Sequence, residues 1–165
     1  MSNREYAIRY GVLGVGFLAV ALGLSLTFKS TLGMGPWGAF QVALAQISGL
    51  TVGRVTQLVS LLTLALAWIL MVKPTTTSVL NMVCVGQFMD WFLAIIPTVG
   101  DSVYIRSFVF LLGLFCFSFG ISLYLKAGLG SGHRDSLMLG LQLRSGFSIR
   151  RSRTTLDATV LVIGI

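Results

Sequence analysis

The stretch KSTLGMGPW at residues 29–37 has a counterpart 97 positions later, KAGLGSGHR at residues 126–134. Each begins with a lysine directly after a long apolar run and carries Leu-Gly-x-Gly at the same spacing. The same shift aligns eleven identical residues in a 32-residue window, most of them Gly, Ser, Lys or Arg, which a shared apolar composition does not explain. The chain is therefore predicted to contain a duplicated unit. In the first copy the identical residues are Gly23, Ser25, Leu26, Lys29, Leu32, Gly33, Gly35, Leu44, Ser48, Gly49 and Arg54.

Four apolar runs around these stretches are long enough to cross a membrane, which takes roughly 20 helical residues. They cover residues 10–28, 55–72, 77–96 and 107–125. Only 10% of the residues are charged and the mean hydropathy is +0.89, whereas soluble domains carry about 25% charged residues. This composition predicts an all-α fold, a polytopic transmembrane helix bundle, and excludes a cytosolic enzyme. The first run lacks a small-residue cleavage site and is interpreted as an uncleaved anchor.

A fifth apolar run, residues 154–165, has only 12 residues. A helix ending in mid-bilayer would leave its last carbonyl groups without partners. We therefore expect this chain to be truncated, with more protein following Ile165.

The net charge of +7 comes from basic residues in the short gaps between apolar runs. With the N-terminus in the cytoplasm, nine Lys and Arg residues lie on the inside and three on the outside. Because cytoplasmic loops are rich in Lys and Arg, a cytoplasmic N-terminus in the inner (cytoplasmic) membrane is predicted. This distribution makes the lipid bilayer the expected partner and argues against nucleic acid.

The first unit, residues 1–102, holds three crossings, and the second, residues 103–165, holds two, the last one truncated. An odd number of crossings places the two units in opposite orientations. Inverted three-helix repeats are typical of secondary transporters, although a fold alone does not assign an activity.

Between the first and second crossing of each unit lies a short segment, residues 36–47 in unit one and 132–143 in unit two. As a helix, residues 37–47 would reach only about 16 Å, too short to cross. The segment either dips into the membrane and returns, or lies flat at the interface with Trp37 as an anchor. Both alternatives stay open, so the bundle is predicted to contain short re-entrant or interfacial helices.

If the segments dip, the Gly-x-Gly turns place N–H groups and the positive end of a half-helix beside a lysine, which suits an anionic group. The predicted substrate-binding residues are Lys29, Gly33, Gly35, Trp37, Lys126, Gly130, Gly132 and Arg134.

Ionisable residues inside a membrane are functional candidates. Asp90, with Asn81 on the same run, is predicted either to couple transport to protons or ions or to form a structural ion pair, and Asp135 joins this coupling set. Asp157 is interpreted as the partner of Arg153 in an i, i+4 salt bridge.

His133 is interpreted as a surface histidine, with a proton-sensing role near neutral pH as the alternative. The sequence around it matches no hydrolase or kinase motif, and the two cysteines lack metal-ligand spacing. We therefore expect no catalytic residue, metal or cofactor.

Three patterns resemble the YczE-like bacterial integral membrane proteins, distant relatives of the YitT type. They are residues 29–37, Asn81 with Gly86 and Asp90, and the stretch at residues 128–139. The resemblance covers nearly the whole chain and implies a bacterial source, a cytoplasmic-membrane location and, at most, transport or export of small molecules. The chain differs from the family pattern in carrying His133 where a proline-like residue is common.

Two functional hypotheses follow. The first is a transporter of a small anionic or zwitterionic solute, held by the two lysines and the Gly-x-Gly turns and coupled through Asp90. The second is a non-transporting membrane scaffold or regulatory protein whose loops bind head groups or another protein. A homo-oligomer is compatible with either hypothesis.

Overall fold

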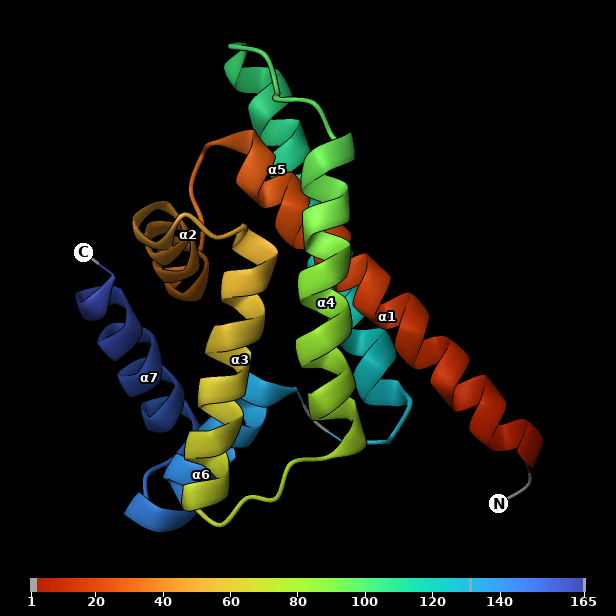
Figure 1. Ribbon diagram of the computed structural model, residues 1–165, viewed down its shortest axis with the longest axis vertical. Helices are drawn as coiled ribbons and strands as arrows, with labels where there is room; N and C mark the ends of the chain where they lie inside the picture. Colours follow the sequence, from red (N-terminus) through yellow and green to blue (C-terminus); the bar gives the residue numbers. More distant parts are fainter. Residues whose placement is uncertain (1–2, 131, 165) are drawn as a thin grey trace.

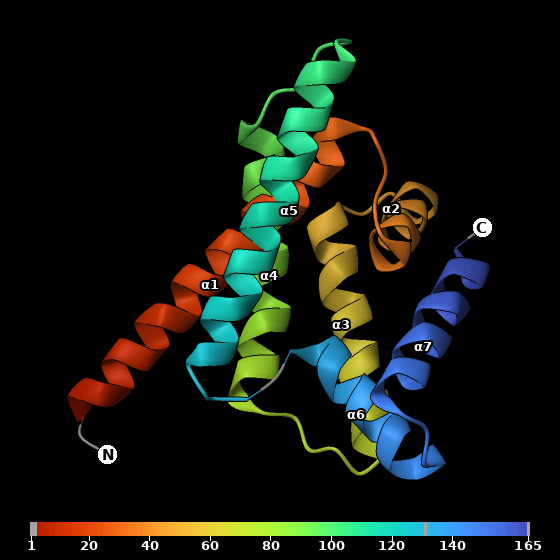
Figure 2. The same cartoon turned by 180° about the vertical axis from the view of Figure 1, so that it is seen from behind.

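The computed structural model describes residues 3–130 and 132–164, and within these residues the chain is entirely helical, without strands (Figure 1). Four long helices form the main bundle. Of the three shorter ones, α2 and α6 pack against α3, and α7 packs against α2 and α6 (Figure 2). The helices are α1 (Asn3–Ser30), α2 (Pro36–Ser48), α3 (Val52–Ile69), α4 (Thr76–Ile95), α5 (Val103–Lys126), α6 (His133–Ser145) and α7 (Ile149–Ile163).

The helix boundaries follow local capping signals. Helix α3 begins three residues before the predicted run because the Thr51 hydroxyl accepts a hydrogen bond from the Arg54 N–H. Helix α2 begins with Pro36, whose missing N–H costs nothing at a helix start. It ends at Gly49, where a positive φ of 69° favours glycine.

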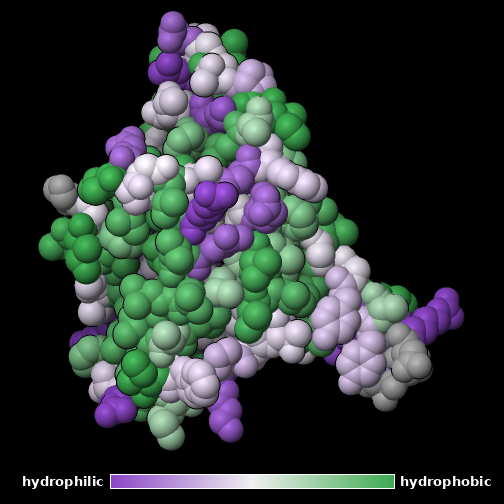
Figure 3. All heavy atoms as spheres, viewed as in Figure 1, coloured by the Kyte–Doolittle hydropathy of each residue, from purple (hydrophilic) through white to green (hydrophobic). Residues whose placement is uncertain are grey.

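Four helices, α1, α3, α4 and α5, are long and apolar enough to cross a membrane. They correspond to the four predicted runs. Figure 3 shows apolar side chains over most of one face of the bundle, with hydrophilic groups at the ends and in one central cluster. The exposed apolar side chains include Phe108, Phe115 and Phe119 of α5. A surface of this kind is stable in lipid and not in water.

The elements of the two predicted units match at the shift of 97 residues. Helices α2 and α6 both have 13 residues, and the glycines that end them, Gly49 and Gly146, have the same φ of 69° and ψ of 9°. Gly33 and Gly130 precede these helices with φ values of 130° and 126°. The division at residue 102 and the opposite orientation of the units in a membrane stay predictions.

Helices α1 and α5 cross in opposite directions at two pairs of glycines. A Cβ atom on Gly16 would lie 3.0 Å from the Gly120 carbonyl oxygen, and one on Gly23 would lie 2.6 Å from that of Gly113. Side chains at these positions would separate the two backbones, so glycine is required for the close approach. Under the shift of 97, Gly16 corresponds to Gly113 and Gly23 to Gly120, so each contact is the repeat equivalent of the other.

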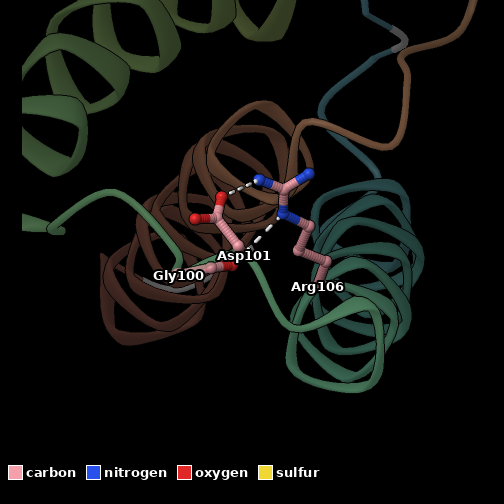
Figure 4. Close-up of polar contacts among 3 residues, drawn as sticks. All are labelled: Gly100, Asp101 and Arg106. Atoms are coloured by element: carbon pink, nitrogen blue, oxygen red, sulfur yellow. Dashed lines mark hydrogen bonds and ion pairs between the residues drawn. The ribbon is translucent and has the colours of Figure 1, made fainter.

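Helices α4 and α5 are joined by a loop that carries a surface ion pair. The Arg106 guanidinium lies 3.0 Å from Asp101 Oδ1 and donates a second hydrogen bond to the Gly100 carbonyl oxygen (Figure 4). The Asp101 side chain is fully exposed, and an exposed pair adds little to stability.

Candidate solute-binding cavity

A cavity of about 410 Å³ lies inside the bundle. Its apolar wall comes mainly from α1, α4 and α5, and its polar wall from α2, α6 and α7. Sites for small molecules have this mixture of apolar walls and a few convergent polar groups. The described lining residues are Val20, Leu24, Trp37, Thr56, Asn81, Val85, Phe117, Ile121, Tyr124, Leu125, Gly132, His133, Arg134, Asp135, Met138, Arg153, Leu156 and Asp157.

Eight of the lining residues form four pairs separated by 97 positions in the sequence. Both predicted units therefore contribute the same structural positions to one cavity. The pairs are Val20 with Phe117, Leu24 with Ile121, Trp37 with Arg134, and Thr56 with Arg153.

Side chains from the first turns of α2 and α6 meet at this cavity. The guanidinium carbon of Arg134, at the start of α6, lies 5.0 Å from the centre of the Trp37 ring, at the start of α2. A cation over an indole face is an attractive arrangement. Neither helix start is capped by a hydrogen bond from the side chain of its N-cap residue, Gly35 or Gly132. Helix N-termini carry partial positive charge, which contributes to the potential in the cavity.

Four charged side chains line the cavity: Arg134, Asp135, Arg153 and Asp157. Asp157 Oδ1 accepts a hydrogen bond of 2.9 Å from Trp37 Nε1, and Asp135 Oδ2 accepts one of 3.3 Å from the Tyr124 hydroxyl.

In the part of the chain that the structure describes, no salt bridge joins these four charges. The predicted Arg153–Asp157 salt bridge is therefore wrong, because Asp157 turns toward Trp37 instead.

Arg134 is partly buried in the cavity wall. Its Nε atom is buried and, among the described residues, has no hydrogen-bond partner. Burial lowers the pKa of Arg134 to about 10, an effect that the nearby Asp135 and Asp157 oppose. The side chain therefore stays charged at neutral pH, with unused hydrogen-bond donors.

His133, predicted to be a surface residue, is buried with only 7% of its surface exposed. That prediction fails because α6 packs its first turn against α3 and α4. His133 Nδ1 lies 3.0 Å from Asn81 Oδ1, and Nε2 lies 3.1 Å from Ser60 Oγ. Burial, followed by the charge of Arg134, lowers the pKa of His133 to about 3, so the ring is neutral at pH 7.

The structure brings together part of the predicted site. Five of the predicted residues line the cavity: Trp37, Gly132 and Arg134 of the binding set, and Asn81 and Asp135 of the coupling set.

The described lining includes neither lysine, because Lys29 and Lys126 lie at opposite ends of the antiparallel pair α1 and α5. Gly33, Gly35 and Gly130 shape the loops before the short helices but do not line the cavity.

Asp90 lies away from the cavity, at the start of α3. Its Oδ2 accepts a hydrogen bond of 2.6 Å from the Thr51 hydroxyl, and its Oδ1 accepts one of 2.8 Å from the Gly53 N–H. A carboxylate at a helix N-terminus satisfies a free N–H group and interacts favourably with the helix dipole. This geometry gives Asp90 a capping role that tethers α4 to α3.

Replacing Asp90 by alanine is expected to destabilise the protein by about 2 kcal/mol, because two hydrogen bonds to a charged acceptor are lost. Asp90→Asn keeps one acceptor and should lose less. Thermal unfolding in detergent measures both, with the exposed Asp101→Asn as a control expected to change little. An unchanged melting temperature in Asp90→Ala would contradict the capping role.

The polar cavity residues outside the predicted site include Tyr124, His133 and Arg153, and Asp157 has a different partner from the one predicted. The sequence did carry a signal for Asp157 and Arg153, since the shift of 97 maps them onto Ser60 and Thr56 of the first unit. Identity between the copies does not reveal this signal, because the residues at these positions differ.

Comparison with known proteins places the chain in a family. Residues 7–165 match the model of a family of unknown function, DUF6198. The chain is 35% identical to the uncharacterized membrane protein YczE of Bacillus subtilis, with 96% of this chain and 74% of that protein covered. It is 32% identical to the uncharacterized protein YyaS of the same organism, covering 96% and 80%.

An uncharacterized protein of Haemophilus influenzae is 28% identical, covering 88% of this chain and 66% of that protein. No solved structure matches the chain. The family match over nearly all the residues, together with four apolar helices of membrane-spanning length, shows that the chain belongs to the DUF6198 family as a YczE-like membrane protein.

Proposed function

We propose that this membrane protein transports a small solute and is not an enzyme. The observation that carries the proposal is the charged cavity, which both predicted units line at equivalent positions and where the side chains of Trp37 on α2 and Arg134 on α6 meet. In transporters with inverted repeats, the substrate site lies at the interface of the repeats, near the ends of broken helices.

The charged groups that line the cavity support this function over a purely structural bundle. Charged side chains inside a membrane protein are expensive and mark substrate or ion pathways. Among the described residues, none of the four charged side chains of this cavity forms a salt bridge. The meeting of Trp37 and Arg134 inside the bundle also favours the re-entrant interpretation of α2 and α6 over the interfacial one.

The proposed location is the cytoplasmic membrane, with the N-terminus inside. Lys29, Arg54 and Arg106 belong to one end of the bundle, at the end of α1 and the starts of α3 and α5. Nine basic residues belong to the other end or to the elements that begin there. The excess of positive charge supports assigning that end to the cytoplasm.

Filling the cavity tests this proposal. The full chain, reconstituted in liposomes, is incubated with a ¹³C-labelled extract of bacterial metabolites, and internal solutes are identified by mass spectrometry. We expect at least one labelled solute to accumulate above protein-free liposomes. Leu24→Trp places an indole in the cavity and should reduce this accumulation at least about tenfold.

The matched control is Leu18→Trp on the same helix, where the side chain is 40% exposed and outside the cavity lining. It should transport like the unmodified protein. If folded protein accumulated no solute, or if both variants transported equally, the proposal would fail. The scaffold or regulatory role would then be the remaining hypothesis.

A further inference from the structure

We propose that the cavity binds a zwitterionic solute, a small molecule that carries one carboxylate and one ammonium group beside an apolar portion. The inference rests on the proposed function, because it concerns the same cavity. It selects one class from the anionic and zwitterionic solutes that the sequence left open. In the proposed orientation the solute carboxylate faces Arg134 and the ammonium group faces Asp157 and Asp135.

The first argument for a zwitterion is the balance of charge in the cavity. Two arginines and two aspartates line it, so its formal charge is zero with His133 neutral. An anionic or cationic solute would leave one uncompensated charge beside the partly buried Arg134, Asp135 and Asp157, which is costly. A zwitterion adds no net charge and supplies a counter-charge to each sign of the lining.

The second argument is that charged side chains in the cavity have unused hydrogen-bond donors and acceptors. Asp157 and Asp135 each accept one bond through a single carboxylate oxygen, from Trp37 and Tyr124. A carboxylate can accept further bonds, so an ammonium group has acceptors available. On the cationic side, Arg134 is stacked on Trp37 rather than paired with an acid, and its Nε has no partner among the described residues. The planar guanidinium group of an arginine can donate two parallel hydrogen bonds to a solute carboxylate.

The four charged groups lie on two elements, with Arg134 and Asp135 in the first turn of α6 and Arg153 and Asp157 on α7. Arg134 lies at the start of α6, where the helix N-terminus adds positive potential. Asp157 lies on α7 beyond Trp37, and Arg153 is exposed at the edge of the cavity. Apolar side chains from α1 and α5, including Leu24, Phe117 and Ile121, form the opposite wall. A cavity of about 410 Å³ therefore offers a carboxylate site, an ammonium site and an apolar surface together.

The test compares each zwitterion with its two halves. Leucine is paired with 4-methylpentanoate, which lacks the amine, and with 3-methylbutylamine, which lacks the carboxylate. Glycine with acetate and methylamine, and phenylalanine with 3-phenylpropionate and 2-phenylethylamine, give a smaller and a larger set. Binding to the full chain in lipid nanodiscs is measured by calorimetry. In at least one set, we expect the zwitterion to bind about tenfold or more tightly than either half.

Charge-removing variants should switch this preference in opposite directions. Arg134→Gln leaves the cavity with one excess negative charge, so the amine should bind at least as well as the zwitterion. Asp157→Asn keeps an acceptor for Trp37 and leaves the cavity with one excess positive charge. The carboxylate analogue without the amine should then bind at least as well as the zwitterion. The exposed Arg144→Gln and Asp101→Asn are charge-matched controls and should keep the original preference.

The outcomes separate this inference from the proposed function. If no zwitterion binds more tightly than its halves, or if both cavity variants change the preference in the same direction, the zwitterion inference is overturned. Transport of a purely anionic solute would overturn it too, while leaving the proposed function intact. Tight zwitterion binding without accumulation in liposomes would support the inference and reject transport. If Arg134→Gln does not fold, the comparison in the unmodified protein still decides.

Discussion

Gly120→Val is expected to prevent α1 and α5 from packing and to lower stability by about 3 kcal/mol or more. A Cβ atom at Gly120 would lie 2.6 Å from the Val20 backbone nitrogen and 2.7 Å from the Gly16 carbonyl oxygen. Both neighbours are backbone atoms of a helix, so a rotamer change cannot relieve the overlap. Thermal unfolding in detergent and the yield of folded protein measure the effect.

The control for this prediction is Gly14→Ala on α1, where an added Cβ atom meets nothing within 4 Å. Since alanine favours the helix over glycine, this variant should be neutral or slightly more stable. Gly120→Ala should lie between the two, because one methyl group already overlaps the Val20 backbone. A normal melting temperature for Gly120→Val would show that the two helices do not cross at these glycines.

Acidification is expected to destabilise the protein through His133. The folded-state pKa of about 3 lies below the ordinary histidine value of 6.5, so the unfolded state binds more protons between these values. The stability is therefore fully present above pH 6.5 and falls as the pH drops toward 3, by about 1.4 kcal/mol per pH unit. At pH 4.5 this amounts to a loss of about 3 kcal/mol.

Other groups also titrate in this range, so the comparison needs a variant without the imidazole. His133→Gln keeps hydrogen-bonding capacity toward Asn81 and Ser60 but has no charge to gain. Between pH 7 and pH 4.5, the unmodified protein should lose about 3 kcal/mol more than His133→Gln. Parallel stability curves for the two proteins would show that His133 is not buried in the neutral form.

The membrane class and the helices could be predicted from the sequence because run length and composition respond directly to the thickness of a bilayer. Helices α2 and α6 were predicted nearly to the residue, since Pro36 and Gly49 mark the ends of α2, whereas α7 begins at Ile149, before the predicted run of residues 154–165. The burial of His133 could not be predicted in this way. It depends on α6 packing against Ser60 and Asn81, which lie 73 and 52 residues away in the sequence.

The candidate site was predicted in part for a related reason. Identical residues, such as Lys29 and Lys126, reveal the duplication. These two lysines also belong to the predicted binding set. The four equivalent pairs that line the cavity all differ between the copies, and one of them, Trp37 with Arg134, belongs to the predicted binding set. Residues that are identical in the two copies reflect what their common backbone conformation requires. The chemistry of the cavity depends on residues that differ between the copies, because both copies line the same cavity.

The reciprocal glycine contacts between α1 and α5 have a further consequence. In them, position 16 contacts 120 and position 23 contacts 113, so the two partners exchange roles, as in the isologous interface of a two-fold symmetric dimer. Two separate copies of one ancestral chain could form such an interface, but mutation would alter both copies together. Joining them in one polypeptide lets a single cavity carry tryptophan on one side and arginine on the other.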